Sequence, residues 1–332
     1  MAGAYAFGCA GPRLLPVERG FFREADPWGF ILFGRNCLSP DQLRRLTGEL
    51  REAVGRDAPV MIDQEGGRVQ RMGPPSWDCY LPALDQTRAA GDLWQEAMVL
   101  RSRLIADELQ AGGIDVNCTP LADLVEPQTH PVLLNRLYGG DPERVVGAAR
   151  AVVEGQLMQG VLPVLKHVPG YGRAAPDPHL GLARLDQPLS ELESRDFAPF
   201  RALADLRMAM TAHIVVEALD PDCPATTSPE AIRYIREEMG LGGFLMTDDI
   251  SMGALSGTVA ERGAASLAAG CDLVLRCNAT LREMEAVAAL GQLTHEAARR
   301  ADRALEERRA PEPFDRAAAK ARLGELVGAA AA

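Results

Sequence analysis

The 332-residue sequence is poor in basic residues and in long apolar runs. Lys and Arg number 35 against 46 Asp and Glu, for a formal net charge of −11, whereas binding to nucleic-acid phosphates requires a basic face. No stretch reaches the length of a membrane span, and no basic residue precedes Arg13, as a secretory or lipoprotein signal would require. We therefore expect a cytoplasmic protein that binds neither nucleic acid nor a membrane.

Paired cysteines are missing as well. The seven cysteines are scattered, odd in number and without a Cys-x-x-Cys pair, which indicates reduced thiols in a cytosol rather than a disulfide framework. Cys271 and Cys277 lie on either side of the apolar run 273–275 and fit the two ends of a buried strand better than a metal site. Because metal binding needs three or four converging ligands, we expect neither a metal nor a cofactor.

The sequence does contain a regular alternation of strand and helix signals. Short apolar runs rich in β-forming residues occur at 5–8, 29–33, 59–62, 114–117, 161–165, 208–212, 243–246 and 272–275. Helical periodicity lies between them at 40–54, 93–112, 142–159, 189–203, 229–239 and 259–269. Several of these helices begin with a capping residue before a proline, as at Ser39, Asp141 and Ser228.

This alternation predicts an α/β protein in which residues 1–332 form a single TIM-type (β/α)8 barrel. The crossover after residues 5–8 is short, so the pairing of the first two strands is the weakest part of the prediction. After Cys277 the pattern is helical only, at 281–290, 295–309 and 316–327. We expect these extra C-terminal helices, within 280–327, to pack on the barrel.

Polar residues follow the predicted strands more often than turns alone require. The residues are Asp63, Gln64, Glu65, Asn117, Asp123, Lys166, His167, His213, Asp248, Asp249 and Asn278. Because the carboxyl ends of parallel strands meet on one face of a barrel, they predict a shared pocket. Structural roles are predicted for His130 and His295, which have no supporting neighbours, and a hydrogen-bonded position near the core is predicted for His213.

Three segments favour a polar substrate in this pocket. In 62–72, a glycine pair lets the backbone approach a ligand and Asp63, Arg68 and Arg71 offer acceptors and forked donors, although a salt-bridged turn is an alternative. In 166–179, three prolines and two glycines predict an irregular loop above the barrel mouth. There Asp177 can fix the tautomer of His179, unless the two form only a loop hydrogen bond. In 246–252, a carboxylate projects from a strand end, or else caps the next helix.

Taken together, these segments resemble glycoside hydrolase family 3, and most of all the bacterial β-N-acetylglucosaminidases of peptidoglycan recycling. The resemblance runs from 29–36 to 270–278, with the motifs in the order of the family. It implies a retaining exo-β-N-acetylglucosaminidase that removes terminal, non-reducing β-N-acetylglucosamine from muropeptides by double displacement through a covalent glycosyl-enzyme.

The resemblance also implies roles for individual residues. Asp248 corresponds to the nucleophile, and His179, oriented by Asp177, corresponds to the acid and base. The residues that contact the sugar correspond to Asp63, Arg71, Arg136, Lys166 and His167. The sequence departs from the family pattern where Tyr171 replaces a histidine and Pro178 replaces a serine, and both changes bear on the closing of the catalytic loop.

Two further functions fit the same residues. A neutral acid/base histidine repels an anionic acceptor less than a carboxylate would, so phosphate in place of water would give a β-N-acetylglucosaminide phosphorylase. The altered loop would also suit a catalytically silent sugar-binding protein that senses wall fragments. In each case the expected partner is a small molecule, an N-acetylglucosamine-containing muropeptide, and the expected oligomeric state is a monomer.

Overall fold

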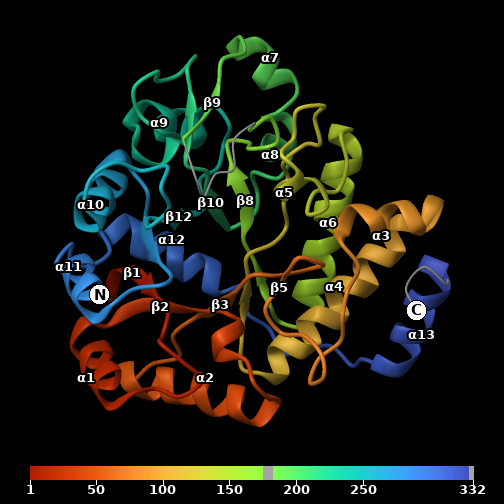
Figure 1. The fold of residues 1–332 in the computed structure, drawn as a ribbon, viewed down its shortest axis with the longest axis horizontal. Coiled ribbons are helices and arrows are strands. Elements are labelled where there is room, and N and C mark those ends of the chain that lie inside the picture. The colour runs from red at the N-terminus through yellow and green to blue at the C-terminus, as the bar shows by residue number, and fades with distance from the viewer. Residues whose placement is uncertain (175–181, 329–332) are drawn as a thin grey trace.

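A parallel sheet forms the centre of the molecule (Figure 1). The computed structural model describes residues 1–174 and 182–328. The strands of the sheet are hydrogen-bonded in the order β7-β6-β3-β2-β1-β13-β12-β10-β8. They are β1 (Gly3–Phe7), β2 (Pro27–Leu32), β3 (Val60–Ile62), β6 (Val116–Asn117), β7 (Leu162–Pro163), β8 (Leu165–Val168), β10 (Met208–Thr211), β12 (Phe244–Asp249) and β13 (Leu273–Arg276).

The sheet nearly closes into an eight-stranded barrel, because its two end strands, β7 and β8, are consecutive pieces of one run separated only by Val164. The backbone N–H of Ala122, after β6, donates to the carbonyl of Lys166 in β8 at 2.9 Å and extends the contact across the join. We count β7 and β8 together as the fifth barrel strand. All eight predicted strands are present, and β1 pairs with β2 in parallel as predicted.

Helices surround the barrel and connect its strands (Figure 1). The longer connecting helices are α1 (Pro16–Ala25), α2 (Pro40–Val54), α4 (Trp94–Ala111), α6 (Pro142–Met158), α9 (Pro229–Glu237) and α10 (Val259–Ala269). The shorter ones are α3 (Ala83–Ala89), α5 (Pro131–Leu134), α7 (Leu189–Ser194), α8 (Ala198–Ala202) and the 3-10 turns η1 (Gly34–Asn36), η2 (Gly91–Leu93) and η3 (Ala225–Thr227). Two small pairings lie outside the barrel, β4 (Gln64–Gly66) with β5 (Val69–Gln70) and β9 (Ala183–Leu185) with β11 (Ile214–Val216).

The predicted helix caps are confirmed. The side chains of Ser39, Asp141 and Ser228 accept hydrogen bonds from the backbone N–H three residues further on, at 3.4, 3.0 and 3.1 Å. One expected helix, 189–203, is instead divided into α7 and α8. Pro199 explains the division, because proline has no N–H to continue a helix but fits the first turn of a new one.

Side chains of the strands alternate between the barrel interior and the layer of helices, as the two-residue period of a strand requires. The interior receives Ala4, Ala6, Ile31, Met61, Leu273 and Leu275. The helix layer receives Tyr5, Phe7, Phe30, Leu32, Val60 and Val274. Burying each large apolar side chain contributes about 1.5–3 kcal/mol, so both faces of the barrel hold the strand ends in place.

The C-terminal helices are α11 (Leu281–Ala288), α12 (His295–Leu305) and α13 (Arg316–Val327), close to the predicted bounds. α12 buries Ala297, Ala301 and Ala304 against the interior cluster of the barrel. α13 packs on α3 and α4, beside α4 at the edge of the molecule (Figure 1). In residues 1–174 and 182–328, no helix is both long and apolar enough to cross a bilayer.

Candidate active site

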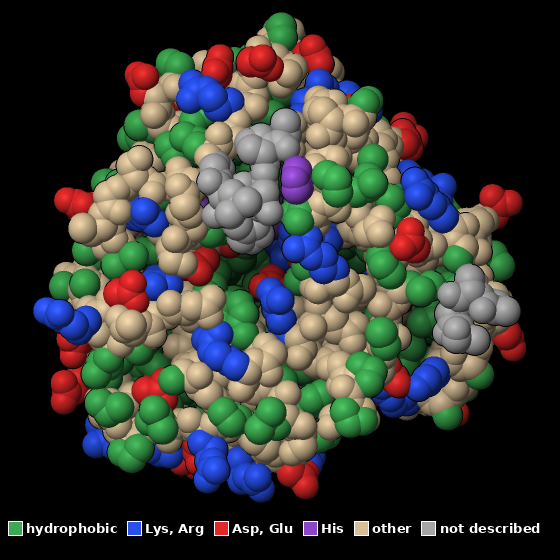
Figure 2. All heavy atoms as spheres, viewed as in Figure 1, with side chains coloured by type: hydrophobic (Ala, Val, Ile, Leu, Met, Phe, Trp, Pro, Cys, Tyr) green, Lys and Arg blue, Asp and Glu red, His purple; other side chains and the backbone are tan. Residues whose placement is uncertain are grey.

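One cavity opens at the carboxyl ends of the barrel strands. Its volume is about 390 Å³, at the small end of the range of roughly 300–1,000 Å³ for small-molecule sites. Figure 2 shows a hollow near the middle of this face, with acidic and basic side chains at its edge. Six of the predicted site residues line the cavity: Asp63, Arg71, Arg136, Lys166, His167 and Asp248.

The β4–β5 hairpin after the third barrel strand positions Asp63 and Arg71. Gly66 and Gly67 turn the chain with φ values of +88° and +59°, and a Cβ on Gly66 would lie 2.1 Å from a side-chain nitrogen of Arg101. Only glycine fits this turn, as the sequence predicted. The side-chain oxygen of Gln64 accepts the N–H of Arg71 at 2.8 Å and so fixes the second strand of the hairpin.

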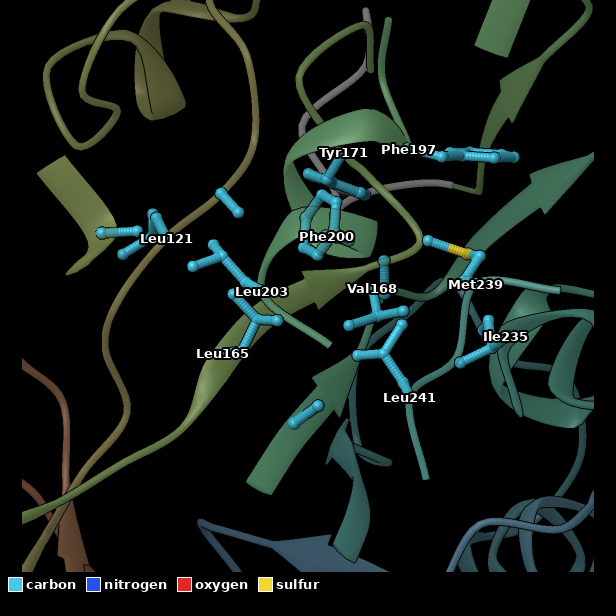
Figure 3. Close-up of a cluster of buried hydrophobic side chains, with 14 of the residues drawn as sticks. Leu121, Leu165, Val168, Tyr171, Phe197, Phe200, Leu203, Ile235, Met239 and Leu241 are labelled. Carbon is cyan, nitrogen blue, oxygen red and sulfur yellow. The ribbon is translucent and has the colours of Figure 1, made fainter. Parts of the chain in front are cut away.

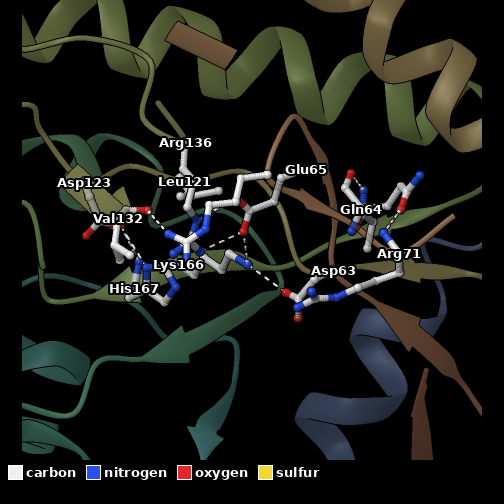
Figure 4. Close-up of polar contacts among 12 residues, drawn as sticks. Asp63, Gln64, Glu65, Arg71, Leu121, Asp123, Val132, Arg136, Lys166 and His167 are labelled. Carbon is white, nitrogen blue, oxygen red and sulfur yellow. Dashed lines mark hydrogen bonds and ion pairs between the residues drawn. The ribbon is translucent and has the colours of Figure 1, made fainter. Parts of the chain in front are cut away.

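Four charged side chains form a network at the cavity, and three of them, Asp63, Arg136 and Lys166, line it (Figure 4). The ammonium of Lys166 lies between two carboxylates, 2.8 Å from Asp63 and 2.7 Å from Glu65. The guanidinium of Arg136 binds both oxygens of Glu65, at 2.8 and 2.9 Å. The side chains of Lys166 and Glu65 are only 2% and 3% exposed. A paired network at this depth holds its donors in fixed directions before any ligand arrives.

Burial opposes ionisation in this network, but the paired charges reverse the effect. Burial alone would raise the pKa of Glu65, and the neighbouring Arg136 and Lys166 instead hold that pKa well below its usual range. Burial would likewise lower the pKa of Lys166, whereas Asp63 and Glu65 raise it. Lys166 and Arg71 also lower the pKa of Asp63 despite its burial. All of these groups are therefore charged at neutral pH.

Glu65 is the functional residue that sequence reasoning left without a role. It stands two residues after Asp63, and in an extended segment residues i and i+2 project to the same side. That spacing was a usable signal that Asp63 and Glu65 lie on the same side, where both bind Lys166. Its partner Arg136 is 71 residues away in the chain, so no local pattern could reveal the pairing.

His167 is oriented by a buried carboxylate. Its Nδ1 lies 2.9 Å from an oxygen of Asp123, whose other oxygen accepts the N–H of Tyr171 at 2.7 Å. Since Asp123 accepts the Nδ1 proton, the Nε2 atom of a neutral His167 is left as an acceptor for a ligand. The ring of Tyr171 packs near His167, with 6.0 Å between centroids.

An apolar cluster supports the fifth barrel strand from behind (Figure 3). Leu165 and Val168 of β8 pack in this cluster with Phe197, Phe200 and Leu203, all five fully buried. The same short strand directs Lys166 and His167 toward the cavity. The two ligand-facing residues are therefore held by their apolar neighbours in the chain.

The two carboxylates at the end of β12 have different surroundings. Asp249 accepts hydrogen bonds from the N–H and hydroxyl of Ser251, at 3.0 and 2.7 Å, and so stabilises the turn after the strand. Asp248 accepts the N–H of Asp249 at 2.7 Å, and its carboxylate lines the cavity. The alternative that one of them caps the next helix is wrong, because Thr258 caps α10, and both Asp248 and Asp249 line the cavity.

His213 is buried with both ring nitrogens bonded, as the sequence predicted. Nδ1 lies 2.8 Å from the hydroxyl of Thr226, and Nε2 lies 3.0 Å from the backbone carbonyl of Asp249. Burial lowers its pKa, although the charge of Asp248 opposes this. His213 therefore ties the end of β12 to the sixth barrel strand. His130 is also structural, because its Nδ1 accepts the N–H of Val132 at the start of α5.

The predicted acid/base pair, Asp177 and His179, lies outside the described residues, as does Pro178. On the side before this segment, the guanidinium of Arg173 binds both oxygens of Asp196 at 2.9 Å. On the side after it, β9 pairs with β11. Both flanks are thus attached to the fifth- and sixth-strand side of the barrel.

Comparisons with known proteins agree with this architecture. The sequence model of the glycosyl hydrolase family 3 N-terminal domain matches residues 27–306. A β-hexosaminidase of Methylococcus capsulatus is 37% identical over 276 residues, 82% of this chain and 82% of that protein. One from Alkalilimnicola ehrlichii is 38% identical over 288 residues, 84% of this chain and 81% of the relative. NagZ from Neisseria gonorrhoeae, solved with N-trifluoroacetyl-D-glucosamine, superposes with a TM-score of 0.87 at 29% identity and 98% coverage of both chains.

Proposed function

This chain belongs to glycosyl hydrolase family 3 and is a glycoside hydrolase, and from that premise we propose that it is a retaining exo-β-N-acetylglucosaminidase. Its proposed substrate is a muropeptide that carries a terminal, non-reducing β-N-acetylglucosamine. The names of the β-hexosaminidase relatives and the sugar bound to the gonococcal structure support this sugar class. A cytoplasmic location and a monomeric state stay predictions.

The observation that carries the proposal is the position of Asp248 relative to the paired network. Asp248 extends from the seventh barrel strand, and Asp63 follows the third. In a ring of eight strands these two lie across from each other, so a sugar bound in the cavity fits between them. Asp63, Lys166 and His167 would then contact its hydroxyl groups, while its anomeric carbon faces Asp248.

The first step forms the covalent intermediate. A carboxylate oxygen of Asp248 attacks the anomeric carbon, and the bond from that carbon to the leaving-group oxygen breaks. His179 gives its proton to the departing oxygen, and Asp177 orients the ring. The charged network costs no reorganisation during this step, because its ion pairs exist before the sugar binds.

The second step releases the sugar. A water molecule gives a proton to His179 while its oxygen attacks the anomeric carbon, and the ester bond to Asp248 breaks. Two inversions at one carbon give net retention, so the first product formed is the β anomer. Histidine suits both steps at neutral pH because its ordinary pKa is about 6.5.

The proposal is tested with p-nitrophenyl β-N-acetylglucosaminide. We expect the wild-type protein to release nitrophenol, and the Asp248→Ala and His179→Ala variants to lose roughly 10³-fold or more in kcat. Proton NMR of the first turnovers should show the β anomer of N-acetylglucosamine. The α anomer as first product, or full turnover by the Asp248 variant, would overturn the mechanism. Binding without release by the wild type would instead identify the silent sugar-binding protein.

A further inference from the structure

One buried cation lies outside the charged network of the cavity. Arg101, in α4, is only 2% exposed, and among residues 1–174 and 182–328 no carboxylate oxygen lies within 4.0 Å of its guanidinium nitrogens. Burial lowers the pKa of Arg101 to about 10, which leaves the group charged at neutral pH. Lys166 and Arg136, by contrast, each have a carboxylate partner at 2.7–2.8 Å. Because a buried charge without a counter-charge costs stability, the contacts that Arg101 makes instead indicate its role.

The guanidinium of Arg101 binds neutral oxygens from three segments of the chain. Its Nη2 atom donates to the backbone carbonyl of Glu65 in β4. Its Nη1 atom donates to the backbone carbonyl of Leu81 and, at 2.7 Å, to the side-chain oxygen of Gln86 in α3. Leu81 belongs to the segment 71–82, which returns the chain from the β4–β5 hairpin to α3. One planar group thus fastens both the hairpin and its return segment to α4.

The turn of the hairpin is fitted closely around this guanidinium. A Cβ on Gly66 would lie 2.1 Å from Nη2 of Arg101, so only a glycine lets the backbone approach so near. The guanidinium carbon lies 6.0 Å from the ring centroid of Tyr80, and the backbone carbonyl of Tyr80 accepts the N–H of Gly67 at 2.8 Å. Arginine suits this place better than lysine, because its planar fork bonds two carbonyls at once while it packs beside a ring.

Glu65 connects this contact to the cavity. Its backbone carbonyl accepts from Arg101, and its carboxylate binds Lys166 and Arg136, as Figure 4 shows for the three side chains of the network. Lys166 also binds Asp63, which stands two residues before Glu65 in the same segment. A displacement of the Glu65 backbone would therefore move both carboxylates that hold Lys166. A misplacement of about 1 Å in such a group can cost on the order of 100-fold in rate.

We propose that Arg101 is a positioning residue for the reaction, which fixes the backbone of the β4–β5 hairpin so that Asp63 and Glu65 direct Lys166 toward the bound sugar. Arg101 is not among the described residues that line the active-site cavity, so it acts through these neighbours and not on the substrate. This inference rests on the proposed function, since the sugar is the ligand that Lys166 and Asp63 would contact.

The test replaces the guanidinium with an unbranched apolar side chain. Arg101→Met removes the cost of burying a charge, but it leaves the carbonyls of Glu65 and Leu81 without their donor. We expect KM for p-nitrophenyl β-N-acetylglucosaminide to rise roughly tenfold and kcat to change less than about threefold, because contacts with sugar hydroxyls are made before the transition state as well as in it. The Kd of N-acetylglucosamine, measured by isothermal titration calorimetry, should rise by the same factor as KM.

Control variants in the same helix separate positioning from net charge and from stability. Arg103→Met makes the same change two residues away, where the guanidinium donates to the carbonyl of Pro313 and lies over the ring of Phe314, and it should keep the wild-type KM. Leu109→Ala leaves a cavity in the core about two turns further along α4, and it should lower stability without raising KM. Arg101→Lys restores a donor but not the planar fork, so its KM should lie between those of the wild type and Arg101→Met.

The possible results are distinct. A wild-type KM and Kd in folded Arg101→Met, or an equal rise of KM in Leu109→Ala, would overturn the positioning role while the hydrolase stands. If Arg101→Met does not fold, Arg101→Lys decides in its place: a raised KM supports the role and a wild-type KM overturns it. A wild type that releases no nitrophenol would overturn the proposed function. The Kd of N-acetylglucosamine would then still test the hairpin, and an unchanged value in Arg101→Met would overturn the positioning role as well.

Discussion

The two sides of the cavity hold their charged groups in different ways. On the side of the third to fifth barrel strands, the buried Lys166 and Glu65 are paired with each other at 2.7 Å and with further charges at similar distances. On the side of the seventh strand, Asp248 accepts a backbone N–H, and no described Lys, Arg or His nitrogen lies within 4.0 Å of its carboxylate.

This difference matches two different tasks. Paired charges keep their ionisation and direction, which suits groups that must orient hydroxyls of a ligand. A carboxylate without a paired cation keeps its electron density available for attack on carbon. Under the proposed function, the cavity thus has a pre-organised binding side and a reactive side that is fixed through its backbone, by contacts such as that of His213 with the carbonyl of Asp249.

The largest expected effect comes from the two adjacent carboxylates at the end of β12. Asp248→Asn should lower kcat roughly 10⁴-fold, because an amide cannot serve as the nucleophile. Asp249→Asn should lower kcat less than tenfold, since an amide oxygen can still accept the N–H of Ser251. Both variants remove one negative charge from adjacent residues, so kcat on the nitrophenyl glycoside separates reaction from turn stability. Equal losses in the two variants would contradict the assignment of roles.

On the binding side, Glu65→Gln tests the paired network. The change keeps the shape of the side chain but leaves Arg136 without a charged partner and Lys166 with Asp63 alone, so we expect a loss of about 3–5 kcal/mol in the free energy of unfolding and a higher KM. The control is Glu230→Gln, which breaks an exposed pair with Arg233 that is also 2.8 Å long and should cost less than about 1 kcal/mol. Urea unfolding of both variants measures the difference in stability. Similar losses in the two variants would contradict the expectation that burial makes the ion pairs of Glu65 more important for stability than the exposed pair.

The two sides should also respond to different pH ranges. Folding lowers the pKa of His213 through burial, so the unfolded chain binds more protons and stability falls as pH drops below about 6.5. The expected loss is roughly 1.4 kcal/mol for each unit by which folding lowers that pKa. The lowered pKa values of Asp63 and Glu65 add a loss that begins only near pH 4. We would measure the free energy of unfolding of the wild type and of His213→Gln from pH 7.5 to 5.5. The wild-type value minus the variant value should decrease as the pH falls. A difference that does not change with pH would exclude His213 as the source of the loss.

Much of the architecture could be predicted because its signals are local. The eight strand runs and caps such as Ser39 and Asp141 depend on residues a few positions apart, and they are present in the structure. The prediction of one continuous helix at 189–203 was wrong, because it followed the helical period of the sequence and neglected the break at Pro199. Helix α1, in the short first crossover, was not predicted, although its residues do show a helical apolar period.

The sequence predicted which residues belong to the site better than it predicted which of them pair with each other. Asp63, Lys166, His167 and Asp248 lie in or just after the carboxyl-terminal parts of barrel strands, so their convergence follows from the barrel itself. The roles assigned to Asp248 and to the pair Asp177 and His179 stay predictions that the experiments above test. Glu65 was named among the polar residues after the third strand but received no role, although its spacing from Asp63 already placed the two on one side.

By itself, the sequence determined the succession of strands and helices, the tight glycine turn after the third strand and the kinds of polar groups at the barrel mouth, since these depend on near neighbours. Only the tertiary structure decided which charges pair and which stay unpaired. Lys166 meets Asp63 across 103 residues of chain, and Arg136 meets Glu65 across 71. Closure of the barrel buries these groups together, and burial strengthens their ion pairs, so the cavity has one side with paired charges and another where Asp248 has no paired cation among the described residues.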